Sequence, residues 1–174
     1  MIVAILIVVV VASVLLFAAT RPDTYGVHRA ATIDAPPEKI FPLLVDFRQW
    51  TRWSPFEALD PDMKRSYSGA QSGKGAVYDW DGNAQAGQGH MEIVEVSPPK
   101  SVSVQVDFVK PFDAHNLNQF TLDAQGGSTR VTWSMRGTQP FVLKAMSIFV
   151  SPDRLLGKHF ETGLANLKTV AERG

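Results

Sequence analysis

The chain alternates strictly between polar and apolar side chains over Ser101-Val102-Ser103-Val104-Gln105-Val106-Asp107-Phe108. Successive side chains of a β-strand point to opposite faces, so this pattern predicts a strand with one wet face and one dry face. The dry face would hold Val102, Val104, Val106 and Phe108. Whatever else the fold contains must cover that face.

Similar segments lie on both sides of this strand. Five of them, bounded by Gly, Pro, Asp or Asn, cover residues 63–68, 75–80, 89–96, 116–122 and 129–136. Such spacing is typical of an antiparallel meander. A further alternating segment, Tyr25 to Ile33, comes before them and brings the number of predicted strands to seven.

A helix is predicted directly after the first strand. Asp34-Ala35-Pro36-Pro37-Glu38 combines a capping side chain, proline at the first helical positions and an acid in the first turn. Apolar residues then recur at helical spacing, at Ile40, Leu43, Leu44 and Phe47. Pro42 should kink or shorten this helix. The following residues, Gln49 to Pro61, predict an irregular stretch lined by aromatic side chains.

A long amphipathic helix closes the chain. Ser151 is its expected cap, and its apolar stripe consists of Leu156, Phe160, Leu164, Leu167 and Ala171. Gly157 and Gly163 would allow close approach to the surface that it covers. The order of elements predicts an α+β fold in which this helix crosses the concave face of a curved antiparallel sheet. A space remains between them wherever side chains are too small to fill it.

The first twenty residues predict a membrane anchor. Every position from Ile2 to Ala19 is apolar except Ser13, and 18 helical residues span roughly 27 Å, close to the bilayer core. A cleaved signal peptide is disfavoured because no basic residue precedes a run that is longer than usual. The basic residues that follow the run weakly favour a cytoplasmic domain, although its side stays uncertain. We expect an anchor at 1–20, a linker at 21–24 and one domain at 25–174.

Composition narrows the classes of function. The chain carries 17 basic and 17 acidic residues without blocks of charge, so no nucleic-acid-binding face is indicated. Cysteine is absent, which excludes disulfides, thiolate nucleophiles and Cys-ligated zinc. No metal-ligand or phosphate-loop motif indicates a metal or a cofactor. The sequence leaves the oligomeric state open.

Several motifs in order carry a family resemblance. They are Asp34-Ala35-Pro36, Trp50-x-x-Trp53-Ser54-Pro55, Gly73-x-Gly75-x-x-Tyr78-x-Trp80-x-Gly82, Gly87-x-Gly89-x-Met91-x-Ile93, Lys110-Pro111-Phe112, Trp133-x-Met135-x-Gly137 and Gly163-Leu164-Ala165-Asn166-Leu167. Over residues 25 to 172 the chain resembles the membrane-tethered SRPBCC group of START-like, polyketide-cyclase-type helix-grip proteins. The resemblance implies a seven-stranded sheet gripping a C-terminal helix, around a cavity for lipids, polyketides, sterols or other apolar molecules.

Large apolar side chains on the dry faces are the candidates for lining this cavity. The candidates also include one amide side chain, that of Asn118. The full set is Tyr78, Trp80, Met91, Ile93, Val104, Val106, Phe108, Asn118, Phe120, Trp133, Met135, Phe160 and Leu164. A mostly apolar wall with few polar groups is the general form of a small-molecule site. The same residues would equally form the filled core of a two-layer domain, and that alternative stays open.

No catalytic constellation is evident. Strand alternation places most acidic and histidine side chains of the sheet on the wet face, namely Asp107, His90 and Glu92. His159, beside Phe160, could border the cavity. We therefore expect a membrane-tethered binder or carrier of an apolar small molecule or lipid. The alternatives are a cyclase-like enzyme, using Tyr78, Asn116 or His159, and a ligand-free interaction module.

The segment Pro140 to Val150 predicts a short helix that is apolar almost all round, with only Lys144 and Ser147 polar. Such a helix must be covered, either by the domain or by something outside it. One hypothesis makes it a lid at the cavity mouth that also touches the membrane surface. The other packs it beneath the last helix.

Overall fold

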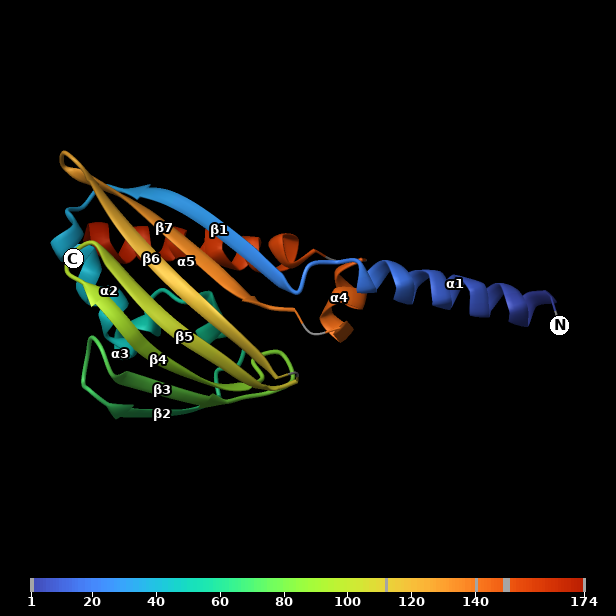
Figure 1. Ribbon diagram of the computed structural model, residues 1–174. Helices are drawn as coiled ribbons and strands as arrows, with labels where there is room; N and C mark the ends of the chain where they lie inside the picture. The colour runs from blue at the N-terminus through green and yellow to red at the C-terminus, as the bar shows by residue number, and fades with distance from the viewer. Residues whose placement is uncertain (1, 112, 140, 149–150, 174) are drawn as a thin grey trace.

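A seven-stranded antiparallel sheet curves around one long helix (Figure 1). The computed structural model describes residues 2–111, 113–139, 141–148 and 151–173. The strand order is β1-β7-β6-β5-β4-β3-β2. Strands β2 to β7 therefore pair in sequence order and β7 pairs with β1, which leaves β1 and β2 at opposite edges. The strands are β1 (Thr24–Ile33), β2 (Lys64–Gly69), β3 (Ala76–Asp81), β4 (Gln88–Ser97), β5 (Ser101–Lys110), β6 (Ala114–Gln125) and β7 (Ser128–Thr138).

The alternation in β5 has the predicted outcome. Val102, Val104 and Val106 are buried on the concave face. Phe108, at the end of the same face, is half-buried. The sequence prediction of seven strands in a curved antiparallel α+β fold is therefore confirmed.

Three short helices follow β1, and one expectation about them is wrong. They are α2 (Pro37–Val45), α3 (Phe47–Trp50) and the 3-10 helix η1 (Pro55–Ala58). Asp34 does not cap α2, which begins after Pro36 without a side-chain cap. Instead the backbone N–H of Asp34 donates to Glu172 Oε1 at 2.7 Å. The Asp34 carboxylate, which lies two residues before the N-cap Pro36, is instead 3.4 Å from Lys168 Nζ of the C-terminal helix.

The C-terminal helix, α5 (Pro152–Arg173), lies in the grip of the sheet. Ser151 caps it as predicted, since Ser151 Oγ accepts from the backbone N–H of Arg154 at 3.2 Å. Its buried face holds Gly157, Phe160, Gly163, Leu164, Leu167 and Ala171. Four of the five predicted stripe residues and both glycines are therefore buried, and the fifth stripe residue, Leu156, is half-buried.

Two further helices lie outside the grip. The N-terminal helix α1 (Ile2–Ala19) extends away from the domain, and α4 (Phe141–Ser147) packs beside it (Figure 1). Lys144 of α4 is buried and forms an ion pair with Asp23, in the segment that joins α1 to β1. Among the described residues, no helix combines the length and the apolarity required to cross a bilayer. Pro140, Phe149 and Val150 of the segment predicted as helical lie outside the described residues.

The close packing of α5 against the sheet at Gly163 can be tested by substitution. A Cβ at this position would lie 2.7 Å from Trp133 Cζ3 and 3.0 Å from Pro55 Cδ. Overpacking costs roughly 1–3 kcal/mol, and only about 1 kcal/mol returns from the better helix propensity of alanine. We expect Gly163→Ala to lower the free energy of unfolding by up to about 2 kcal/mol in urea denaturation. The control Gly127→Ala, where a Cβ meets nothing within 4 Å, should have no effect.

Candidate functional site

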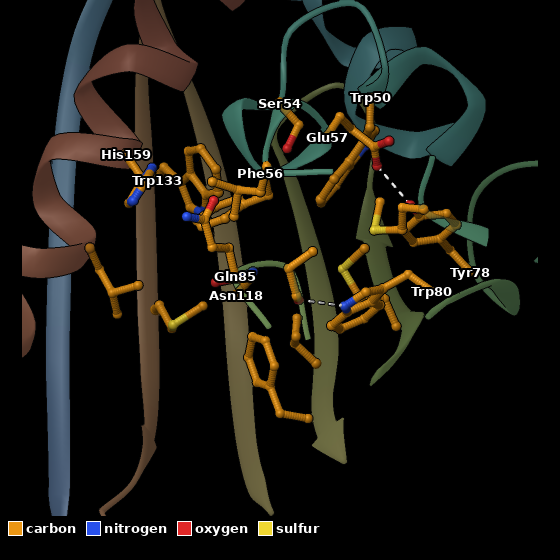
Figure 2. Close-up of a pocket in the computed structure, with 18 of the residues that line it drawn as sticks. Trp50, Ser54, Phe56, Glu57, Tyr78, Trp80, Gln85, Asn118, Trp133 and His159 are labelled. Atoms are coloured by element: carbon orange, nitrogen blue, oxygen red, sulfur yellow. Dashed lines mark hydrogen bonds between the residues drawn. The ribbon is translucent and has the colours of Figure 1, made fainter. Parts of the chain in front are cut away.

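A pocket of about 480 Å³ lies between the concave face of the sheet and the first half of α5 (Figure 2). The segment from Trp50 to Met63, which includes η1, forms another side of it. The α4 residues whose side chains are described do not line this pocket, so the lid predicted from the sequence finds no support in its position. The pocket therefore lies between the sheet and the C-terminal helix, where the sequence predicted a space.

Most of the predicted cavity residues lie on its wall. The wall includes Tyr78, Trp80, Met91, Val106, Phe108, Asn118, Trp133 and Met135. They come from the five strands β3 to β7, which shows that neighbouring dry faces do combine into one surface. Their role in binding a ligand stays a prediction.

The other predicted cavity residues do not line the pocket but lie in the solid core. These are Ile93, Val104, Phe120, Phe160 and Leu164, each at most 2% exposed. Phe160 stacks on Trp133 with ring centroids 4.2 Å apart, and Phe120 packs on the same indole at 5.0 Å. The helix and the sheet are in direct contact here, so no space is left.

Sequence reasoning missed several residues of the wall, most of which lie outside the strands and α-helices. The stretch after α3 contributes Ser54, Phe56, Glu57, Leu59 and Met63, and α3 itself contributes Trp50. The other missed residues of the wall are Tyr25, Gln85, Ala86, Leu155 and Leu156. The aromatic character of residues 50–56 was the available signal. His159, expected at the border, does line the pocket, and its ring packs on Phe56 with centroids 5.2 Å apart.

One charged side chain on the wall, Glu57, is held by two partners. Its Oε1 accepts from the Tyr78 hydroxyl at 2.8 Å, and its Oε2 accepts from Arg65 Nε at 2.7 Å. The Glu57 side chain is only 10% exposed. Burial and the bond to Glu57 raise the pKa of Tyr78 well above its usual value, so this phenol stays protonated. The network ties η1 to β2 and β3.

Several other polar side chains of the sheet are also engaged in hydrogen bonds. Asn116 Oδ1 accepts from the Tyr25 hydroxyl at 2.8 Å. On the convex face His90 Nδ1 lies 2.7 Å from Asp79 Oδ1, and His115 Nδ1 lies 2.7 Å from Asp107 Oδ1. The bond with Asp107 raises the pKa of His115. In the part of the chain that the structure describes, no cluster of three such side chains is suited to a metal ion.

Comparisons with solved structures agree on the fold. The chain is similar to a protein from Chromobacterium violaceum, with 15% identity, a TM-score of 0.60, and coverage of 87% of this chain and 99% of that one. A protein from Mesorhizobium loti gives 19% identity and a TM-score of 0.61, with 86% and 98% covered. Ara h 8.0201 gives 14% identity and a TM-score of 0.56, with 86% and 97% covered. At these identities the likeness concerns the fold alone.

A curved sheet closed around a C-terminal helix, with a pocket between them, defines a helix-grip domain of the SRPBCC class. The profile of one of its families, described as polyketide cyclase / dehydrase and lipid transport, matches residues 25–172, and the chain belongs to this family. Among curated proteins, none matches this chain in sequence.

The bond between Tyr78 and Glu57 can be tested directly. Tyr78→Phe leaves a buried carboxylate oxygen without its donor, and hydrogen bonds to charged groups contribute about 1.5–3 kcal/mol. We expect a loss of that size in urea denaturation. Tyr67→Phe is the control, since this ring packs on Tyr78 with centroids 5.2 Å apart but lies outside the network. Equal stability of the two variants would contradict the assignment.

Proposed function

We propose that the domain binds an apolar small molecule or a lipid in the pocket between the sheet and α5. The observation that carries the proposal is a cavity of about 480 Å³ whose wall is predominantly apolar and aromatic. Ligand sites usually occupy roughly 300–1,000 Å³ and combine such a wall with a few polar groups. The description of the family, which includes lipid transport, supports the same reading.

The alternative of a filled core is less compatible with this geometry. Protein interiors pack densely, and voids larger than a water molecule are few. An empty space of this size would leave the faces of Trp80, Phe108 and Met135 without contacts on one side. Dispersion contacts with a ligand would replace those that are missing.

We further propose that residues 2–19 tether the domain to a membrane. The support is the sequence, which is apolar from Ile2 to Ala19 except at Ser13, and the helical conformation of this segment. The helix also projects beyond the sheet and shares no face with it (Figure 1). The domain would then carry its ligand close to a lipid phase.

Filling part of the pocket should weaken binding. Val106, on the pocket wall, is 3% exposed, and Val106→Phe adds a ring that occupies part of the space. We expect saturable binding of the apolar dye N-phenyl-1-naphthylamine by the wild-type protein, followed by fluorescence, and at least a tenfold weaker affinity in the variant. Gln119→Phe on the convex side is the matched control and should bind normally. Unchanged binding by Val106→Phe would place the dye elsewhere.

The tether is tested by extraction. Membranes from cells that express the full chain should retain it after washing with alkaline carbonate, whereas residues 22–174 should be released. Val9→Lys places a charge at the centre of the span, which costs about 2.5–3.5 kcal/mol, and should reduce the retained fraction. Release of the full chain by carbonate would contradict the tether without affecting the binding proposal.

A further inference from the structure

The large apolar side chains that are exposed on this molecule gather at one end of it. In the part of the chain that the structure describes, they belong either to α1 or to three segments of the domain. The three in the domain are Val109 of β5, Phe141 of α4 and Leu155 in the first turn of α5, which are 59%, 48% and 60% exposed. A single exposed apolar residue needs no explanation, whereas several at one end of a domain indicate an interaction surface.

Strand register places these segments at the end of the domain from which α1 projects (Figure 1). The chain leaves α1 and enters β1 at Thr24, which pairs with Thr138 at the end of β7. The same end of the sheet includes the end of β5, where Phe108 pairs with Ala114 at the start of β6. Helix α4 packs against α1, and only residues 148–151 separate α4 from α5. The exposed apolar side chains therefore lie around the junction with α1.

The pocket opens at this end as well. Most residues of its wall are buried or half-buried, and the two exposed ones are Leu155 and Gln85. Gln85 lies in the turn that joins β3 to β4, just beyond the pair of Asp81 with Gln88. Since Gln88 also pairs with Lys110 at the end of β5, this turn belongs to the same end of the sheet. The mouth of the pocket is thus close to the exposed apolar side chains.

The charges beside these apolar side chains are complementary to phosphate. Three exposed basic residues flank α1, Val109 and Leu155 in the sequence, namely Arg21, Lys110 and Arg154. Within the ranges that the structure describes, none of the three forms an ion pair. The acids next to Arg21 and Arg154 in sequence are neutralised, Asp23 by Lys144 and Asp153 by Arg29. Basic side chains next to apolar ones match the headgroups and acyl chains of a phospholipid surface.

We propose that this end of the domain docks on a phospholipid bilayer and that the mouth of the pocket opens onto it. Val109, Phe141 and Leu155 enter the interface, and an apolar ligand passes between the acyl chains and the pocket without crossing water. Only residues 20–23 separate α1 from β1, and the ion pair of Lys144 with Asp23 ties α4 to that linker. The inference rests on the proposed tether and the proposed binding function, and it names the surface with which the ligand is exchanged.

The test uses the absence of cysteine from the chain, which allows a fluorophore to be placed at one position at a time. Full-length Val109→Cys and Phe141→Cys are labelled with NBD iodoacetamide and reconstituted in phosphatidylcholine vesicles, with and without a nitroxide on the lipid acyl chains. The nitroxide quenches only fluorophores that lie in the bilayer or against it, and we expect both labels to be quenched. Neither residue lines the pocket, so a lipid bound inside the pocket cannot account for the loss of fluorescence.

Two further labels separate docking from tethering. Leu6→Cys in α1 reports the insertion of that helix. Gly127→Cys, in the turn between β6 and β7 at the opposite end of the sheet, should keep its fluorescence. Quenching at Leu6 without quenching at Val109 and Phe141 would overturn the docking surface and leave the tether standing. Absence of quenching at all three positions would contradict the tether and the docking surface together, and equal quenching at Gly127 would also overturn the docking surface.

The basic side chains provide a second measurement. Addition of the anionic lipid phosphatidylglycerol should increase the quenching of the label at position 141, because the three basic residues are drawn to the surface. The double variant Lys110→Gln/Arg154→Gln should lose this increase. The matched control Lys74→Gln/Lys100→Gln removes two exposed lysines from turns at the opposite end of the sheet and should keep it. An increase that persists in Lys110→Gln/Arg154→Gln would overturn the role of these charges.

Discussion

The stacking of Trp133 on Phe160 is the contact on which the rest of the domain depends. The two rings are almost parallel, at 6°, and their centroids are 4.2 Å apart, closer than usual for aromatic pairs. Gly163, one turn along α5, allows this approach because any side chain there would meet the indole. Trp53 and Phe120 then close around the same indole, with centroids 5.6 Å and 5.0 Å away. The helix is thereby fixed to the sheet at one place.

The pocket follows from that fixed contact. Beyond it, towards the start of α5, the helix and the sheet enclose the cavity between them, and only Leu155, Leu156 and His159 of α5 reach its wall. On the other side, the Glu57 network holds η1 against β2 and β3. The polar bonds that keep this side of the wall in place are thus made within the protein.

Sequence periodicity predicted correctly which side chains lie on the concave face of the sheet, but it did not predict which of them line the pocket and which lie in the core. Alternation depends only on neighbouring residues, so it assigned Val106 and Phe120 to the concave face correctly. It carries no information on where the helix touches that face, and Phe120 therefore lies in the core instead of the pocket. Glu57 lies in an irregular segment without a period, and its partners Arg65 and Tyr78 are brought to it by tertiary folding. The cap expected at Asp34 failed because α2 begins two residues later, after Pro36, and the Asp34 carboxylate lies near Lys168 of α5.

The two halves of α5 differ in how firmly they are held. The second half is buried through Leu164, Leu167 and Ala171. The turns before Phe160 contain one buried residue, Gly157. Arg29 of β1 bonds to Asp153 and Glu161 of α5 in exposed ion pairs, and such pairs contribute little to stability. Segments with few buried contacts open locally at a smaller free-energy cost than the whole fold. If the pocket holds a ligand as proposed, local opening of this end of α5 would give the ligand a way out while the rest of the domain stays folded.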